Sequence, residues 1–224
     1  MIVWADASAA QGRAAFGAVF ASSTELWHHS DVVTVDTSKT ELVELAGVVE
    51  AIRWAHQIMT RASAVLSVRC DNMRTIWLLS RLIGPRADGV GQCTHPAMPI
   101  PFGVGTRVRL DPNLRPDSRP RWKLAAKGSR PGVLVDAGTL SIVQRLADGA
   151  AGRWLLLDHA PRETAEIRLC DALARRTLGL TASWSRRLWK GDETIDDLVQ
   201  LVVDRRARAA DTIAEADGGP RAAG

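Results

Sequence analysis

The first third of the chain alternates apolar and polar positions in short runs that predict strands. Residues 2–8 alternate apolar and small side chains around Trp4, which predicts a strand ending near Asp6. Two further runs, 16–21 and 25–35, are rich in apolar and β-branched residues and predict two more strands. The connections between these runs are short, so we expect the three strands to pair as an antiparallel meander.

The pattern then changes to a helical period. Thr37 and Ser38 offer a helix cap, and apolar residues follow on one helical face at 42, 45, 48, 49, 52, 55 and 59. Residues 64–68 predict a fourth strand that runs into Asp71, and residues 72–82 predict a short second helix.

A proline-rich basic stretch interrupts the regular pattern at about 84–131. Eight of the ten prolines lie between Pro85 and Pro131, so a long helix is excluded there. Eight lysines and arginines against two aspartates fall between Arg107 and Arg130. We interpret the stretch as an irregular insertion, with a ribbon at 104–110.

Regular elements return after the insertion, in the order helix, strand, helix, helix. The expected ranges are 139–147, 153–158, 163–178 and 192 to about 216, followed by a frayed tail from 217 to 224. The fourth and fifth strands need helical crossovers to run parallel, and the helices supply them. We therefore predict an α/β fold: a five-stranded mixed sheet, three strands antiparallel and two parallel, flanked by helices. The predicted domain spans 1–180, and 181–224 forms a helical extension.

Composition narrows the class of protein. The chain has 224 residues, 46% of them hydrophobic, enough to bury a core, and a net charge of +4 that fits a polyanionic partner. No apolar run is long enough to span a bilayer and no leader is recognisable, so we expect a cytoplasmic protein without a membrane partner. The three cysteines form no metal-binding spacing and are interpreted as buried residues in a reducing compartment.

Four acidic residues stand in distinct local signatures, at strand ends and on helices. They are Asp6, Glu44, Asp71 and Asp171. Carboxylate oxygens are the ligands that Mg²⁺ and Mn²⁺ prefer, and two such ions about 3.5–4 Å apart stabilise both oxygens of a phosphodiester cleavage. The sequence thus indicates a two-cation site.

Each of these acids also has a structural interpretation. Asp6 suits the start of a turn, and Glu44 suits the first turn of a helix, as does Glu41 one turn earlier. Asp71 suits an N-cap, a role compatible with metal binding because a carboxylate has two oxygens. Asp171 is placed to pair with Arg175 on the next turn of its helix.

Five short motifs follow one another along the chain. The first two are Trp4-Ala5-Asp6-Ala7-Ser8 and the run that starts at Glu44-Leu45-Ala46-Gly47. The remaining three are Cys70-Asp71-Asn72, His159-Ala160 and Cys170-Asp171-Ala172-Leu173-Ala174. In this order they resemble the motifs of type 1 ribonuclease H and of the ribonuclease H domains of reverse transcriptases, whose strand ends in Asp-Gly-Ser and whose first helix carries Glu-Leu-x-Ala. The resemblance covers residues 1–83 and 139–178.

The resemblance implies a metal-dependent endonuclease that hydrolyses the RNA strand of RNA–DNA hybrids. It implies two Mg²⁺ ions, with Mn²⁺ as an alternative: one held by Asp6 and Asp171, the other by Asp6, Glu44 and Asp71. His159 corresponds to a loop histidine that aids product release or proton transfer, tasks that histidine side chains commonly perform. The products would carry a 5′ phosphate and a 3′ hydroxyl.

A second set of residues is expected to contact nucleic acid. Basic side chains can hold phosphates and an aromatic ring can stack on a base; the alternative is a solvated loop. The candidates are Asn72, Arg107, Arg109, Arg119, Arg121, Trp122, Lys123 and Lys127.

Two rival functions stay open at the level of sequence. Thr40 and Glu41 stand where the family often has two asparagines that read the hybrid, which allows a nuclease of the same fold acting on DNA or structured RNA. The loop between His159 and Asp171 is also two residues longer than the common pattern. The other rival is a catalytically silent module that binds nucleic acid through its basic loop.

Overall fold

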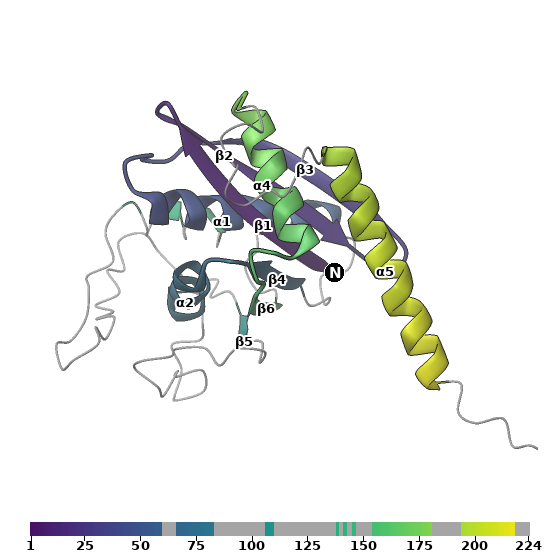
Figure 1. Ribbon diagram of the computed structural model, residues 1–224. Helices are drawn as coiled ribbons and strands as arrows, with labels where there is room; N and C mark the ends of the chain where they lie inside the picture. Colours follow the sequence, from purple (N-terminus) through teal and green to yellow (C-terminus); the bar gives the residue numbers. More distant parts are fainter. Residues whose placement is uncertain are drawn as a thin grey trace, which may run out of the picture.

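The predicted meander forms the amino-terminal part of the sheet in a computed structural model of the chain (Figure 1). β1 (Ile2–Ala10) pairs antiparallel with β2 (Arg13–Ala21), and β2 pairs antiparallel with β3 (Leu26–Val33). A two-residue turn joins β1 to β2, and both of its residues, Gln11 and Gly12, have positive φ angles of 52° and 74°. This turn matches the right-handed twist of the two strands and fixes their register. The structure describes residues 1–59, 66–82, 106–109, 138, 141–142, 145–146, 154–180 and 194–217.

Two parallel strands extend the sheet on the other side of β1. β4 (Leu66–Cys70) pairs parallel with β1, and β6 (Trp154–His159) pairs parallel with β4. The order is β3-β2-β1-β4-β6-β5. All five predicted strands are confirmed, with the predicted directions. The sheet has one strand more than predicted, because β5 (Thr106–Arg109), within the expected ribbon, pairs antiparallel with the outer edge of β6.

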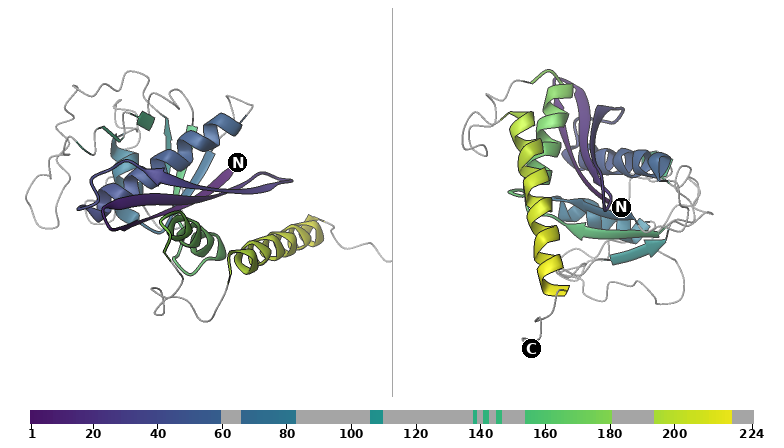
Figure 2. Two further views of the ribbon diagram at one scale, coloured as in Figure 1. Left: turned by 90° about the horizontal axis from the view of Figure 1, so that it is seen from above. Right: turned by 90° about the vertical axis from the view of Figure 1, so that its right-hand side faces the viewer.

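Helices cover both faces of the sheet (Figure 2). α1 (Thr40–Ile58) and α2 (Met73–Leu82) pack on one face in a core with alternate residues of β1 and β2. α4 (Ala165–Thr177) and α5 (Ile195–Asp217) lie on the opposite face, where Trp4 and Val19 belong to a second core. The expected helix at 139–147 is helical at the positions described within it, 141–142 and 145–146, and residue 138 just before it is also helical. Within the described ranges, no helix combines the length and apolar character needed to cross a membrane.

The start of α1 differs from the sequence prediction. Its N-cap is Lys39, which makes no side-chain capping hydrogen bond, and not Thr37 or Ser38. The Asp36 carboxylate accepts hydrogen bonds from the backbone N–H and the hydroxyl of Ser38, at 3.0 and 2.6 Å. Ser38 therefore belongs to an aspartate turn that precedes the helix, and the predicted cap is wrong because this turn competes for the serine.

Candidate active site

The acidic residues gather where β1 and β4 separate. The parallel register between these strands covers only Ile2–Trp4 against 67–69, so Asp6 lies two residues past the last pair. Asp71 directly follows the last residue of β4. Ligands of α/β proteins bind outside the carboxyl ends of parallel strands, and both aspartates stand at that edge.

Glu44 reaches the same place from the first turns of α1. One ligand oxygen from each of Asp6, Glu44 and Asp71 lies within 4.8 Å of the other two, and we call these three residues the acidic triad. Asp6 and Glu44 are only 2% and 8% exposed. Glu41, the competing glutamate, is instead exposed and forms an ion pair with Arg74. The structure thus brings Glu44, and not Glu41, to the two aspartates.

Burial and the repulsion of neighbouring carboxylates disfavour the charged forms of Asp6 and Glu44. Burial, followed by the charges of Asp71 and Asp171, raises the pKa of Asp6 to about 7. Burial, followed by the charges of Asp6 and Asp71 and a hydrogen bond with Asp6, raises the pKa of Glu44 to about 9. Buried carboxylates that repel one another are stabilised either by taking up a proton or by binding a cation. Three oxygen donors at this spacing fit a hard divalent cation such as Mg²⁺ or Mn²⁺.

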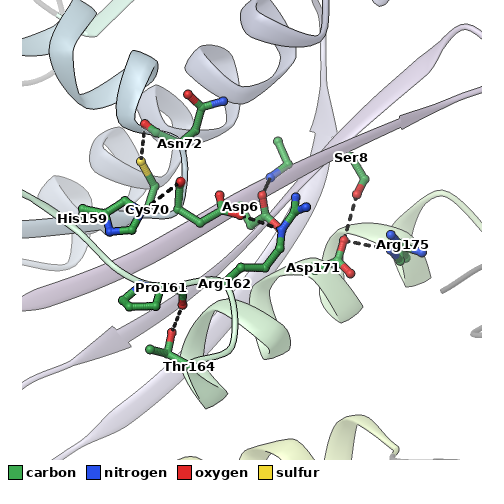
Figure 3. Close-up of polar contacts among 12 residues, drawn as sticks. Asp6, Ser8, Cys70, Asn72, His159, Pro161, Arg162, Thr164, Asp171 and Arg175 are labelled. Carbon is green, nitrogen blue, oxygen red and sulfur yellow. Dashed lines mark hydrogen bonds and ion pairs between the residues drawn. The ribbon is translucent and has the colours of Figure 1, made fainter. Parts of the chain in front are cut away.

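Asp171 stands beside the triad and is not a member of it. It lies on α4, and its Oδ1 accepts hydrogen bonds from the Ser8 hydroxyl at 3.2 Å and from Arg175 Nε at 2.8 Å (Figure 3). The pairing with Arg175 that the helical spacing allowed is therefore present. The charge of Asp171 still contributes to the raised pKa of Asp6, so the two carboxylates are electrostatic neighbours.

The cap of α2 is Asn72, which leaves the Asp71 carboxylate for other contacts. Asn72 Oδ1 accepts hydrogen bonds from the backbone N–H groups of Arg74 at 3.0 Å and Thr75 at 3.1 Å. This geometry is that of an N-cap. The helix is therefore capped by Asn72, and not by Asp71 as the sequence also allowed.

His159 contacts the turn that carries Asp71. It ends β6 in register with Cys70, and its Nε2 lies 3.2 Å from the backbone oxygen of Asp71 (Figure 3). Cys70 Sγ lies 3.5 Å from the backbone oxygen of Asn72 on the same turn. Burial raises the pKa of the Cys70 thiol, which keeps it in the neutral form. The histidine is thus placed to support the position of Asp71.

Arg162 is a site residue that the sequence analysis missed. Its Nε donates a hydrogen bond to Asp71 Oδ2 at 2.8 Å, from the loop that precedes α4 (Figure 3). Partial burial lowers the pKa of the guanidinium, but the charges of Asp71, Asp6 and Glu44 outweigh burial and raise that pKa above its usual value. The two extra residues between His159 and Asp171 were the signal that could have directed attention to this loop.

The predicted nucleic-acid contacts fall mostly outside the described structure. The carboxamide oxygen of Asn72 is engaged in capping, although the residue adjoins Asp71. Arg107 and Arg109 lie on β5, paired with Leu156 and Trp154 of β6. The other five positions lie outside the described residues: Arg119, Arg121, Trp122, Lys123 and Lys127.

Comparison with solved structures finds ribonucleases H. The ribonuclease H1 of the halophilic archaeon Halobacterium salinarum NRC-1 is 13% identical, with a TM-score of 0.43, over 80% of this chain and 96% of that one. LC11 ribonuclease H1, solved in complex with an RNA/DNA hybrid, is 11% identical, with a TM-score of 0.44, over 80% and 96%. The foamy viral protease-reverse transcriptase, also solved with an RNA/DNA hybrid, is 12% identical, with a TM-score of 0.42, over 79% of this chain and 19% of that one. No protein-family model and no curated protein matches the chain.

Because these identities and TM-scores are low, the fold assignment rests on the chain's own topology. Three antiparallel strands, a helix, a parallel strand, a helix, a second parallel strand and a helix follow one another as the motif resemblance implies. Asp6, Glu44 and Asp71 lie on β1, on α1 and directly after β4. The chain has a ribonuclease H-like fold.

Proposed function

We propose that the protein is a divalent-metal-dependent endonuclease that hydrolyses the RNA strand of RNA–DNA hybrids. The observation that carries the proposal is the acidic triad, in which two buried carboxyl groups and Asp71 converge within 4.8 Å at the carboxyl edge of the sheet. Such a cluster is costly to the fold unless it binds a cation. A nuclease would use such a cluster, because the cation that stabilises the carboxylates would also promote phosphodiester hydrolysis.

The site residues divide into cation ligands and residues that hold them. Asp6, Glu44 and Asp71 would hold one ion, and Asp6 with Asp171 the second; Mg²⁺ fits the donors, with Mn²⁺ as an alternative. When bound, the ions supply an activated water and stabilise the leaving oxygen. His159 contacts the backbone oxygen of Asp71, and its proposed role is to aid proton transfer or product release. The products would carry a 5′ phosphate and a 3′ hydroxyl.

The proposed substrate rests on the motifs and on charge. The motif order resembles that of enzymes that act on hybrids, and a net charge of +4 favours a polyanion. The proposed contacts to the nucleic acid are Asn72 beside the triad, Arg107 and Arg109 on β5 at the edge of the sheet, and the basic positions of the insertion. Phosphate contacts of this kind make binding sensitive to salt.

Replacement of Asp71 by asparagine tests the enzyme and its site together. An amide keeps the shape of the side chain but is a poor metal ligand, so Asp71→Asn should fold and lose cleavage by about 100-fold or more. The measurement uses an end-labelled RNA–DNA hybrid with Mg²⁺, Mn²⁺ or chelator. Asp31→Asn, an exposed aspartate on β3, is the matched control and should cleave as the wild type does. Full activity in Asp71→Asn would contradict the site assignment.

One observation favours a second substrate class. Glu41 stands where related enzymes often carry an asparagine that reads the hybrid, and it is engaged in an ion pair with Arg74. A nuclease of the same fold that acts on a DNA strand or on structured RNA would keep the acidic triad and dispense with that asparagine. Cleavage of an all-DNA duplex or a folded RNA in preference to the hybrid would identify this alternative. Salt-sensitive binding without cleavage of any substrate would identify a silent binding module.

A further inference from the structure

The guanidinium of Arg162 places a positively charged side chain within the proposed cation site. Its guanidinium is bonded to Asp71, one of the three triad members, and interacts electrostatically with the other two, Asp6 and Glu44. The side chain comes from the loop before α4, whereas the triad comes from β1, α1 and the end of β4. Its place is therefore set by tertiary structure.

The loop fixes the backbone of Arg162 without fixing its guanidinium. The backbone oxygen of Pro161 accepts hydrogen bonds from the N–H and the hydroxyl of Thr164, at 3.0 and 2.9 Å, which closes a turn around Arg162 (Figure 3). The backbone oxygen of Thr164 then accepts from Arg168 N–H as α4 begins. These hydrogen bonds hold the backbone on both sides of Arg162, whereas its guanidinium, at the end of a long side chain, is bonded to Asp71.

The two partners of the ion pair differ in exposure. The side chain of Asp71 is 10% exposed, whereas that of Arg162 is 56% exposed. Because water reaches the guanidinium, moving it away from Asp71 costs less than separating a fully buried ion pair. The buried carboxylate, by contrast, stays in place and still needs a compensating charge.

We propose that Arg162 and a divalent cation compete for the carboxylate of Asp71, so that Arg162 sets the metal affinity of the site. Asp71 Oδ2 accepts the hydrogen bond from Arg162 Nε, so a metal ion that binds this oxygen must displace the guanidinium. A metal ion that binds the other carboxylate oxygen of Asp71 is instead repelled by the positive charge of the guanidinium. In either geometry Arg162 weakens metal binding at Asp71. The inference rests on the cation site of the proposed function and is independent of which nucleic acid is cut.

Metal binding to Arg162 variants in the absence of nucleic acid tests this competition. Mn²⁺ binding, followed by calorimetry or by the electron paramagnetic resonance of the free ion, should be about 3- to 10-fold tighter in Arg162→Ala and Arg162→Gln than in the wild type. Arg162→Lys, which keeps the charge, should stay closer to the wild type. Arg74→Ala removes an arginine that pairs with Glu41 outside the triad, and it should leave the affinity unchanged.

Thermal unfolding provides a second readout that does not depend on activity. In chelator, Arg162→Ala should melt at a lower temperature than the wild type, because the triad loses its compensating charge. Saturating Mg²⁺ should raise its melting temperature by more than it raises that of the wild type. If Arg162→Ala binds Mn²⁺ as weakly as the wild type or more weakly, the competition is overturned while the metal site stands. If neither the wild type nor Arg162→Ala binds metal, the proposed function fails as well.

Discussion

Two carboxyl groups of the site, those of Asp6 and Glu44, lie in surroundings that disfavour their ionised form. Asp6 and Glu44 are buried against each other, and a hydrogen bond between them is one cause of the raised pKa of Glu44. At neutral pH the pair therefore shares a proton when no cation compensates its charge. A metal ion that binds there must displace that proton, so metal affinity and protonation are linked at these residues.

This linkage predicts how stability depends on pH. The pKa values of Asp6 and Glu44 are raised in the folded state, from 3.8 to about 7 and from 4.5 to about 9. Their contribution to stability is present below about pH 4 and is lost as pH rises through 7 to 9, because the unfolded chain releases these protons first. In chelator the free energy of unfolding should fall across this window, whereas saturating Mg²⁺ should oppose the fall.

Denaturant titrations at several pH values, with chelator or Mg²⁺, measure this dependence. Glu44→Gln supplies the control, because its amide resembles the protonated carboxyl group and cannot ionise. The variant should lose part of the pH dependence in chelator. An identical slope in Glu44→Gln and in the wild type would contradict the assignment of the slope to the triad.

At the scale of elements, close packing of helices on the sheet places the acids. Gly17 on β2 is paired with Asp6, and a Cβ at this glycine would lie 2.0 Å from the backbone oxygen of Cys170 and 2.9 Å from Leu173 Cβ. On the other face, a Cβ at Gly47 would lie 2.6 Å from Ala7 Cβ. The two glycines therefore let α4 and α1 approach the strands that meet at the site.

Gly17→Ala should disturb the site through α4. The added Cβ would clash with the backbone oxygen of Cys170, which cannot move aside as a side chain can. Helix α4 must therefore shift, and Asp171, the residue after Cys170, shifts with it. We expect a loss of about 1–3 kcal/mol in unfolding free energy, as for other overpacked positions, together with reduced cleavage. Chemical denaturation and the hybrid assay measure the two effects.

The control for Gly17→Ala is a substitution at a glycine where an added Cβ would meet no other atom within 4 Å. Gly12, in the turn between β1 and β2, has open space around its Cβ position, and asparagine tolerates its positive φ of 74°. Gly12→Asn should therefore change stability by a few tenths of a kcal/mol at most. Equal stability of Gly17→Ala and the wild type would show that α4 does not depend on this contact.

The elements also show what sequence patterns can and cannot predict. The positions of most strands and helices followed from local periodicity, and the resemblance of the run from Glu44 to the family's helix motif distinguished Glu44 from Glu41. The pairing of β5 with β6 and the arrival of Arg162 at Asp71 depend on where distant segments meet. No local pattern encodes such contacts. The cap of α1 was missed for a different reason, since Asp36 and Ser38 form a turn that competes with capping.

Over the whole molecule, α5 covers the face of the sheet that carries α4. Leu198 and Val202 of α5 join the core of Trp4 and Leu169, and Arg205 pairs with Glu166 of α4 at 3.1 Å. Arg206 also donates a hydrogen bond to the backbone oxygen of Ser22, just after β2. The carboxyl-terminal end of α5 projects past the sheet (Figure 1). The helical extension predicted from the sequence thus packs against the predicted domain, and the domain boundary at 180 remains a prediction.

The contribution of this packing can be measured with two identical substitutions on one helix. Leu198 is fully buried and Leu201 is 36% exposed. Leu198→Ala leaves a cavity between α5 and α4 and should lower the free energy of unfolding by about 2–5 kcal/mol. Leu201→Ala has the same effect on helix propensity and should stay within about 0.5 kcal/mol of the wild type. Urea unfolding followed by far-ultraviolet circular dichroism gives both values. Equal losses in the two variants would mean that α5 acts as a separate helix whose buried face adds nothing to the stability of the ribonuclease H-like domain.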